Sequence, residues 1–323
     1  EIAQCLVGSE MCIRDRYSHP LPFGQANIGL RYEHVDFDYF ENATFVPGQS
    51  RVYDNIFPNI SVNGQLGKVQ FQVSYAAKTQ RPNYSQLRNN ITYANRFTWQ
   101  TGNPLLKPSV THDITAVGVW RFFQAMVSYK VVRDYILYWG TQVENQSATT
   151  LINYINHDRL PSLTVMLAAS PTIGIWNLNA SAIVMKQWFS LDAAGQRRTY
   201  NNPLFVGSLN NTFTLPAGFL LSADFNYQSR GQVQNITLKR PQYTLNIGLR
   251  KSLFNDALSI EARANDLLLG CKQEALLYME SAQMKDLSWS DTRSFSLTVR
   301  YKFNAAKSKY KGTGAGQDTI NRM

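Results

Sequence analysis

Long apolar segments, cysteines and histidines are scarce in this chain. The 323 residues include three cysteines and four histidines. No run approaches the roughly 18 consecutive apolar residues that a transmembrane helix needs, the densest being Val165 to Ala169. A helical membrane protein is therefore excluded. A transmembrane β-barrel is not, because its strands show only short alternating segments and leave the mean hydropathy low.

The chain also lacks the patterns of catalytic, metal-binding and nucleic-acid-binding proteins. The histidines, His19, His34, His112 and His157, are isolated, and neither HExxH nor GxSxG occurs. We therefore predict no catalytic residue, no metal site and no cofactor. The net charge is +10, but the lysines and arginines are scattered singly and form no basic helix, which argues against a nucleic-acid partner.

Residues 1–16 differ from the rest of the chain, because they show no alternation and contain Cys5 and Cys12. One set of codons for Leu6 to Asp15 is CTC GTG GGC TCG GAG ATG TGT ATA AGA GAC, which resembles a transposase-type sequencing-library adapter. Glu1-Ile2 and Cys5 also match the adapter on either side of its variable index. We interpret residues 1–16 as an assembly artefact and expect the natural protein to begin upstream of Tyr17. Cys271 is then the one native cysteine.

Alternation of apolar and polar residues with period two dominates the sequence from about residue 25. The clearest case places Phe219, Leu221, Ala223, Phe225 and Tyr227 on one face and Ser222, Asp224, Asn226 and Gln228 on the other. The same pattern predicts about twelve strands. They lie at 25–39, 52–66, 68–79, 110–121, 124–138, 150–169, 175–188, 202–214, 218–229, 241–253, 257–267 and 294–303.

The connections between these strands fall into two classes that alternate along the chain. Tight connections lie around Gly67, around Phe123 and at 171–174, 216–218 and 255–256. Long polar connections lie at 40–51, 80–109, 139–149, 189–201, 230–240 and 268–293. Short periplasmic turns alternating with long extracellular loops are typical of an outer-membrane barrel.

A soluble β-sandwich shows the same alternation, but two features favour the membrane barrel. Many predicted strands exceed ten residues, whereas ordinary strands have about 5 to 6. Aromatic residues also mark strand ends. Phe219 and Tyr227 are separated by roughly 20 Å of height in a tilted strand, close to the thickness of the apolar band. Trp176 and Trp188 repeat this pairing, and we expect Tyr301 and Phe303 to close the last strand.

Two segments resemble a known family. Arg81-Pro82-Asn83-Tyr84-Ser85-Gln86-Leu87 and Thr101-Gly102-Asn103-Pro104-Leu105-Leu106-Lys107-Pro108 resemble the barrel signature of TonB-dependent outer-membrane receptors. Residues 309–323 resemble the tail of Bacteroidetes outer-membrane barrels of this type. The sequence departs from the family pattern at Arg88, where proline is common, and at Ser109, where glutamate is usual.

The resemblance implies the C-terminal part of a barrel of about 22 strands closed by an N-terminal plug. Residues 17–303 would form barrel wall and residues 304–323 a flexible, basic periplasmic tail. The implied location is the outer membrane of a Gram-negative cell, and the implied partners are membrane lipid and, through the missing N-terminal region, the TonB complex. A surface lipoprotein partner is compatible with it. The twelve strands alone would leave two unpaired edges.

Ligand contact in such receptors falls on extracellular loops and the upper lumen, and the ligand itself is not specified by the sequence. In loop 80–109 the candidates are Tyr84, Asn90, Tyr93, Arg96, Phe97 and Trp99, and in loop 189–201 they are Arg197 and Arg198. The alternative is that the motif residues only hold the fold of the loop. These are Arg81, Pro82, Tyr84, Leu87, Gly102, Asn103, Pro104 and Pro108. An alternative function is a complete twelve-stranded barrel acting as a lipase, protease or adhesin.

Overall fold

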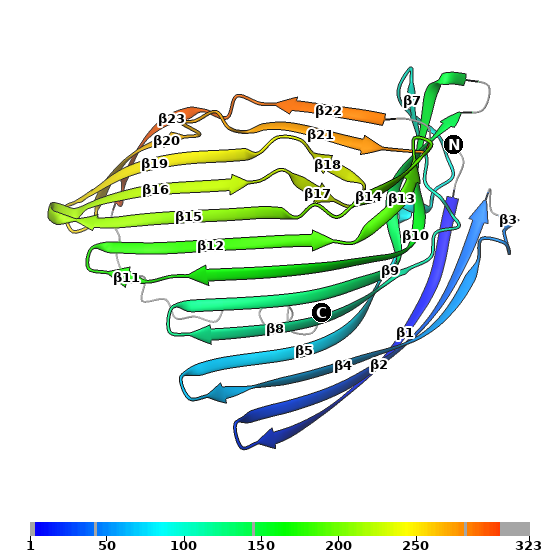
Figure 1. Cartoon of the computed structure of the whole chain (residues 1–323), viewed down its shortest axis with the longest axis horizontal. Helices are drawn as coiled ribbons and strands as arrows, with labels where there is room; N and C mark the ends of the chain where they lie inside the picture. The colour runs from blue at the N-terminus through cyan, green and yellow to red at the C-terminus, as the bar shows by residue number, and fades with distance from the viewer. Residues whose placement is uncertain (1–3, 42–43, 144–145, 281–282, 304–323) are drawn as a thin grey trace.

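One long antiparallel sheet contains most of the regular structure. The protein is described by a computed structural model that covers residues 4–41, 44–143, 146–280 and 283–303, with side chains from residue 15 onward except at 41, 146 and 147. Figure 1 shows the sheet as a curved wall whose tight turns gather at one end and whose hairpins gather at the other. Among the described residues, no helix is long and apolar enough to span a membrane.

Within the described residues, thirteen long strands follow one another in the sheet in chain order. They are β1 (Gln4–Leu21), β2 (Gly24–Glu41), β4 (Arg51–Leu66), β5 (Val69–Gln80), β8 (Ser109–Trp120), β9 (Phe123–Val143), β10 (Gln146–Ala169), β12 (Trp176–Gln187), β15 (Leu204–Leu215), β16 (Phe219–Gln228), β19 (Gln242–Leu253), β20 (Leu258–Asn265) and β23 (Ser294–Tyr301). The short strands β3 (Thr44–Phe45), β6 (Thr92–Asn95), β7 (Thr98–Gln100) and β11 (Thr172–Ile173) belong to the same sheet. The sheet is open, since β1 pairs only with β2 and β23 only with β20 in the described part of the chain, which confirms the expectation of two unpaired edges.

The twelve predicted strands correspond to β2 through β23 of this series. The additional strand, β1, includes residues from the segment that we interpret as adapter-derived, and Gln4 to Arg16 pair with Glu41 to Gly29 of β2. Such pairing uses backbone N–H and C=O groups, and an unpaired edge accepts any extended segment. The strand therefore does not depend on which side chains these residues carry.

The predicted long polar loops are wrong in their structure, because most of them are strand extensions and hairpins. β9 continues to Val143 and β10 begins at Gln146. A two-stranded sheet, β13 (Phe189–Ala193) with β14 (Gln196–Tyr200), occupies 189–201. A four-stranded sheet is made of β17 (Gly231–Val233), β18 (Ile236–Leu238), β21 (Lys272–Tyr278) and β22 (Gln283–Trp289). Backbone pairing continues beyond the apolar band because it needs no apolar face, and the alternation signal is lost there.

The two faces of the sheet differ in chemistry as the alternation predicts. Large apolar side chains on one face are exposed, including Val127 (46%), Leu167 (58%) and Leu297 (71%). The opposite face carries hydrogen-bonded polar groups, for example Asp113, which accepts from the hydroxyls of Thr115 (2.8 Å) and Ser128 (2.9 Å). An exposed apolar face and a polar face with charged groups fit a wall between lipid and a wet interior.

The strand-end aromatics mostly lie where expected. Trp176 and Phe219 begin β12 and β16, and Tyr227 lies one residue before the end of β16. Trp188 follows the last residue of β12. Phe303 does not close the last strand, because the ladder of β23 ends at the pair of Tyr301 with Leu258, where β20 begins. The short helix η1 (Pro216–Gly218) supplies one of the tight turns, and the turn near Phe123 is formed by Arg121 and Phe122.

We predict that arginine is tolerated on the polar face of β9 and not on the apolar face. Val127 lies four residues from the start of the strand, which is roughly 10 Å of height and near the middle of the apolar band. Val127→Arg should lower the free energy of unfolding in lipid vesicles by about 2–4 kcal/mol. The matched control is Ser128→Arg, which places the same charge beside Asp113 and should cost far less. Equal losses for both variants would contradict the assignment of the faces.

Candidate functional site

The receptor-like motif encloses a pocket at the hairpin end of the sheet. This motif pocket has a volume of about 370 Å³, within the range of small-molecule sites. It lies between β2, β4 and loop 80–109. Its lining is formed by Val35, Asp36, Phe37, Arg51, Tyr53, Arg81, Pro82, Asn83, Tyr84, Leu87, Pro104, Leu106 and Pro108. The lining includes the guanidinium groups of Arg51 and Arg81 and the phenol rings of Tyr53 and Tyr84, and most of the remaining lining is apolar. These groups can bind a planar or anionic ligand by stacking and hydrogen bonding.

A buried ion cluster fixes the loop beside this pocket. The side chain of Glu33 is 2% exposed and forms ion pairs with Arg81 and with Arg31, the latter at 3.3 Å. Arg31 also lies 4.7 Å from the ring centre of Phe57. A buried carboxylate needs such partners, because an unpaired charge away from water is very costly. Sequence reasoning missed Glu33, although its spacing of two from Arg31 places both on the polar face of β2.

The two halves of the motif pack against each other. Helix α1 (Tyr84–Leu87) begins with a capping box, in which the Asn83 side chain accepts from the Gln86 N–H (2.9 Å) and the Gln86 side chain accepts from the Asn83 N–H (2.9 Å). Gly102 lies directly against this turn, since a Cβ there would be 2.4 Å from the Gln86 carbonyl oxygen. The two halves of the motif, residues 81–87 and 101–108, therefore pack together into one compact unit.

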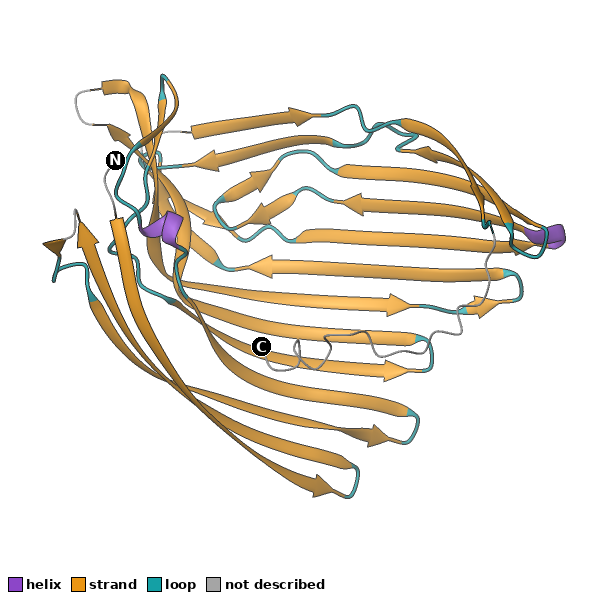
Figure 2. Ribbon diagram, turned by 180° about the vertical axis from the view of Figure 1, so that it is seen from behind, coloured by secondary structure: helices purple, strands orange, loops and turns teal. Residues whose placement is uncertain are grey.

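The motif also anchors the loop to a distant strand. The Asn103 amide donates to the Tyr154 carbonyl (2.9 Å), and the Lys107 N–H donates to the Asn156 side chain (2.8 Å). Strand β7 pairs in parallel with β10, with Thr98 opposite Thr150. Loop 80–109, which connects β5 to β8, thus reaches β10, and Figure 2 shows α1 lying over the sheet near the hairpin end.

Of the predicted aromatic ligand contacts, Tyr84, Tyr93 and Phe97 are exposed and Trp99 is half-buried. Tyr93 on β6 and Trp99 on β7 form an edge-to-face pair with ring centres 5.1 Å apart. The Arg96 guanidinium lies 5.5 Å from the Phe97 ring centre. Tyr84 is 72% exposed and Tyr93 66%. The structure brings Tyr93 and Trp99 together and places Tyr84 on the motif pocket, whereas Asn90 is exposed between α1 and β6 and does not line that pocket.

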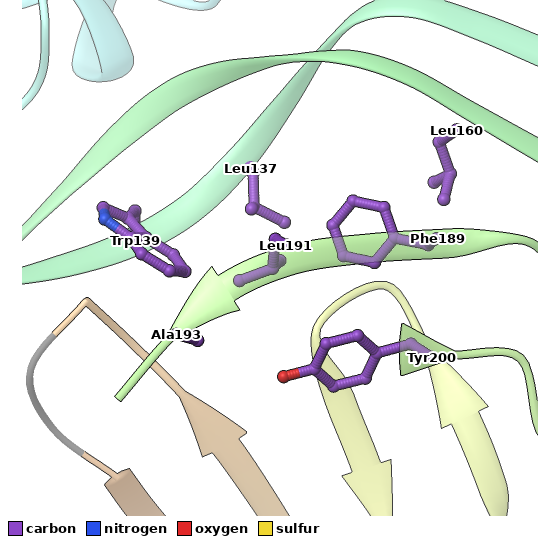
Figure 3. Close-up of a cluster of buried hydrophobic side chains, with 7 residues drawn as sticks. All are labelled: Leu137, Trp139, Leu160, Phe189, Leu191, Ala193 and Tyr200. Atoms are coloured by element: carbon purple, nitrogen blue, oxygen red, sulfur yellow. The ribbon is translucent and has the colours of Figure 1, made fainter. Parts of the chain in front are cut away.

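The second candidate pair belongs to a hairpin that packs onto β9 and β10. Figure 3 shows Phe189 and Leu191 of β13 facing the side chains of Leu137, Trp139 and Leu160. Arg197 forms an exposed ion pair with Asp192 (3.1 Å). The Arg198 guanidinium lies 3.7 Å from the Tyr278 ring centre and donates to the Ala193 carbonyl (3.1 Å). The Arg198 contacts join two hairpins, so its position is explained by packing alone.

The ionisable groups inside this hairpin core are held neutral. Burial raises the pKa of Tyr200 to about 12, although the charge of Arg198 acts in the opposite direction. Burial also lowers the pKa of His157, whose ring lies edge-on to Phe189 at 4.6 Å. His157 is therefore a packing residue at neutral pH. In the described part of the chain, no three His, Cys, Asp or Glu side chains group as metal ligands.

We predict that Arg81 and Glu33 are energetically coupled. Arg81→Met leaves Glu33 with Arg31 alone and should lower the free energy of unfolding by about 1–3 kcal/mol, with faster proteolysis inside loop 80–109. Adding Glu33→Gln should restore part of the loss, because a neutral amide costs less to bury than a carboxylate. The control is Arg159→Met, which removes an exposed ion pair to Asp158 and should change little. Additive effects of the two substitutions would contradict the coupling.

Solved structures of outer-membrane transporters and receptors share this fold. The FrpB iron transporter from Neisseria meningitidis (F3-3 variant) aligns with 94% of this chain and 45% of its own, with a TM-score of 0.60 and 14% identity. The copper transporter OprC aligns with 92% of this chain and 48% of its own (TM-score 0.63, 14% identity). The siderophore receptor PiuA from Acinetobacter baumannii aligns with 92% and 44% (TM-score 0.57, 10% identity). At these identities the likeness shows the fold alone, and the chain spans about half the length of these structures.

Comparison with curated proteins finds no match. The model of one family, described as the outer membrane protein beta-barrel family, matches residues 17–301. This range begins at the first residue after the segment that lacks alternation and ends with the last residue of β23. Because the match covers most of the chain, the protein belongs to the outer membrane protein beta-barrel family and is located in the outer membrane of a Gram-negative cell.

Proposed function

We propose that this chain is the C-terminal barrel portion of a TonB-dependent receptor that takes up a large nutrient ligand. The observation that carries the proposal is the motif loop, which is held by Glu33 and β10 at the hairpin end and leaves a pocket and exposed aromatic rings there. The solved structures with the same fold, an iron transporter, a copper transporter and a siderophore receptor, support a role in uptake. The share of those chains that is matched supports a larger barrel.

The proposed orientation places the tight turns in the periplasm and the hairpins outside the cell. Tyr301 ends β23 beside the start of β20, at the end with the tight turns. The basic tail, residues 304–323, lies outside the described residues, and we propose that it is periplasmic. Residues 17–303 are then barrel wall, and residues 1–16 do not belong to the natural protein. The family match, which begins at residue 17, supports this division.

In this proposal the loop residues have two separate roles. Four residues hold the loop in place. Arg81 forms the ion pair with Glu33, and the side chain of Leu87 is buried. Gly102 allows the close approach to the turn of α1, and Asn103 anchors the loop to β10. Ligand contact falls on the exposed rings of Tyr84 and Tyr93, on the half-buried ring of Trp99 and on the guanidinium groups beside them. Aromatic faces with adjacent cations suit a ligand that has planar or sugar rings and anionic oxygens. Energy from TonB, acting through the N-terminal region, would release the bound ligand inward.

Uptake by the full-length receptor tests this function. A strain that depends on the receptor is grown with a ferric siderophore, haem, cobalamin or an oligosaccharide as the limiting nutrient. One of these should support growth only when both the receptor and TonB are present. Replacing Tyr93 and Trp99 with alanine should raise the half-saturating concentration of that nutrient about 30-fold, since truncating each of two central aromatic contacts costs about 1 kcal/mol.

The matched control is Phe45→Ala, which removes an exposed ring that lies outside loop 80–109 and pairs with Phe40 of β2. Its uptake should equal that of the unchanged receptor, and all variants should have the same surface abundance. Growth that is independent of TonB would contradict energised transport. Normal uptake by the double alanine variant would remove the loop from the ligand site while leaving transport intact.

A further inference from the structure

A second hollow, outside the motif pocket, collects positive charge at the upper ends of β16 and β19. This cationic hollow has a volume of about 700 Å³, again within the range of ligand sites. Its charged lining is Arg230, Lys239, Arg240, Lys272 and Glu274. Its remaining lining is Pro241, Tyr243, Leu268, Leu269 and Gly270. No residue is shared with the motif pocket, so the two are separate sites.

The single carboxylate of the hollow does not neutralise it. Glu274 already has a partner outside the lining, Lys285, whose ammonium lies 2.9 Å away. The hydrogen bond and charge of Lys285 lower the pKa of Glu274, and the charges of Arg240 and Lys239 lower it further. Four cations therefore face one carboxylate that is already paired. An excess of positive charge around a cavity attracts anions, and guanidinium groups match the oxygens of phosphate.

The floor of the hollow lies on the face of the sheet that is turned to lipid. Tyr243 pairs with Tyr227 and shares its face with Ile247 and Leu249, which are 38% and 43% exposed. Gly270 packs on this ring, since a Cβ there would lie 2.5 Å from the Cδ2 atom of Tyr243. Leu268, also in the lining, is 47% exposed. The hollow therefore has an apolar floor on the outer side of the wall.

The cationic hollow lies at the level of the lipid headgroups. Phe219 at the start of β16 and Tyr227 near its end are separated by roughly 20 Å across the apolar band. Lys239 and Arg240 precede β19 and Arg230 follows β16, so all three lie just beyond the aromatic residues that mark the upper limit of that band. Cations above an apolar floor at this height complement an amphiphile with an anionic headgroup.

We propose that the cationic hollow binds the phosphate groups of an anionic glycolipid in the outer leaflet of the outer membrane. Lys239, Arg240 and Lys272 bind the phosphate oxygens, while Tyr243 and Leu268 contact the apolar part of the lipid. The proposal uses the orientation given above and does not depend on transport or on the ligand of the motif pocket. The basic residues of the cationic hollow therefore bind lipid, whereas the guanidinium groups near the motif loop contact the transported ligand.

Binding of purified lipid A to the detergent-extracted full-length receptor tests the site. The probes are lipid A with its phosphates, lipid A from which the phosphates have been removed, and inorganic phosphate alone. The Lys239→Gln/Arg240→Gln variant should bind phosphorylated lipid A about 30-fold more weakly, from about 1 kcal/mol for each cation. Uptake through the motif pocket should be unchanged in this variant.

The matched control removes two cations from the opposite rim. Lys68→Gln/Arg121→Gln lies in the tight turns before β5 and β9 and should bind lipid A like the unchanged protein. Arg230→Gln is a second variant in the same hollow and should also weaken binding. Equal binding of phosphorylated and dephosphorylated lipid A, or equal binding by the hollow variants, would overturn the proposal. Equally tight binding of inorganic phosphate would assign the hollow to free phosphate and overturn the lipid assignment.

Discussion

Pairing of the backbone within the membrane is the constraint on which this structure depends. In hydrocarbon each N–H and C=O group must have a partner within the protein, because no water can replace it. A sheet satisfies this requirement only through neighbouring strands, so each long strand is fixed by the ones beside it. The long antiparallel ladders from β2 to β23 meet the requirement across the apolar band. Under the same constraint, the two open edges are the places where further strands of the proposed larger barrel would pair.

The alternation of side chains follows from that ladder and separates three environments. Within the band, one face contacts lipid and the other contacts the wet interior, so apolar and polar residues must alternate. Above the band both faces meet water or other hairpins. The pairing continues there, as in β9, β10 and the hairpin of β13 and β14, with polar and apolar residues in no fixed order. The proposed ligand contacts lie in this upper region, where the loop is free of the lipid constraint.

These environments explain what the sequence predicts and what it does not. The faces of β16 and the tight turns follow from local alternation and turn residues, so both could be predicted. The hairpins of the long connections could not, because no alternation marks them. Asn103 contacts Tyr154, which is 51 positions away in the sequence. Glu33 is buried against Arg81, which is 48 positions away. Only the assembled sheet brings these residues together. The motif directed attention to loop 80–109, and the structure shows that Gly102 and Arg81 hold the shape of this loop.

The sheet acts as a membrane wall with one face toward lipid and one face toward water. Single cysteines placed along β16 of the full-length protein in native membranes measure this alternation, with Cys271 replaced by serine. Positions 222, 224 and 226 should react with a water-soluble maleimide, while positions 221, 223 and 225 should resist it and report a lipid environment through an attached fluorophore. Reactivity that shows no alternation along the strand would mean that the two faces of β16 do not lie in different environments.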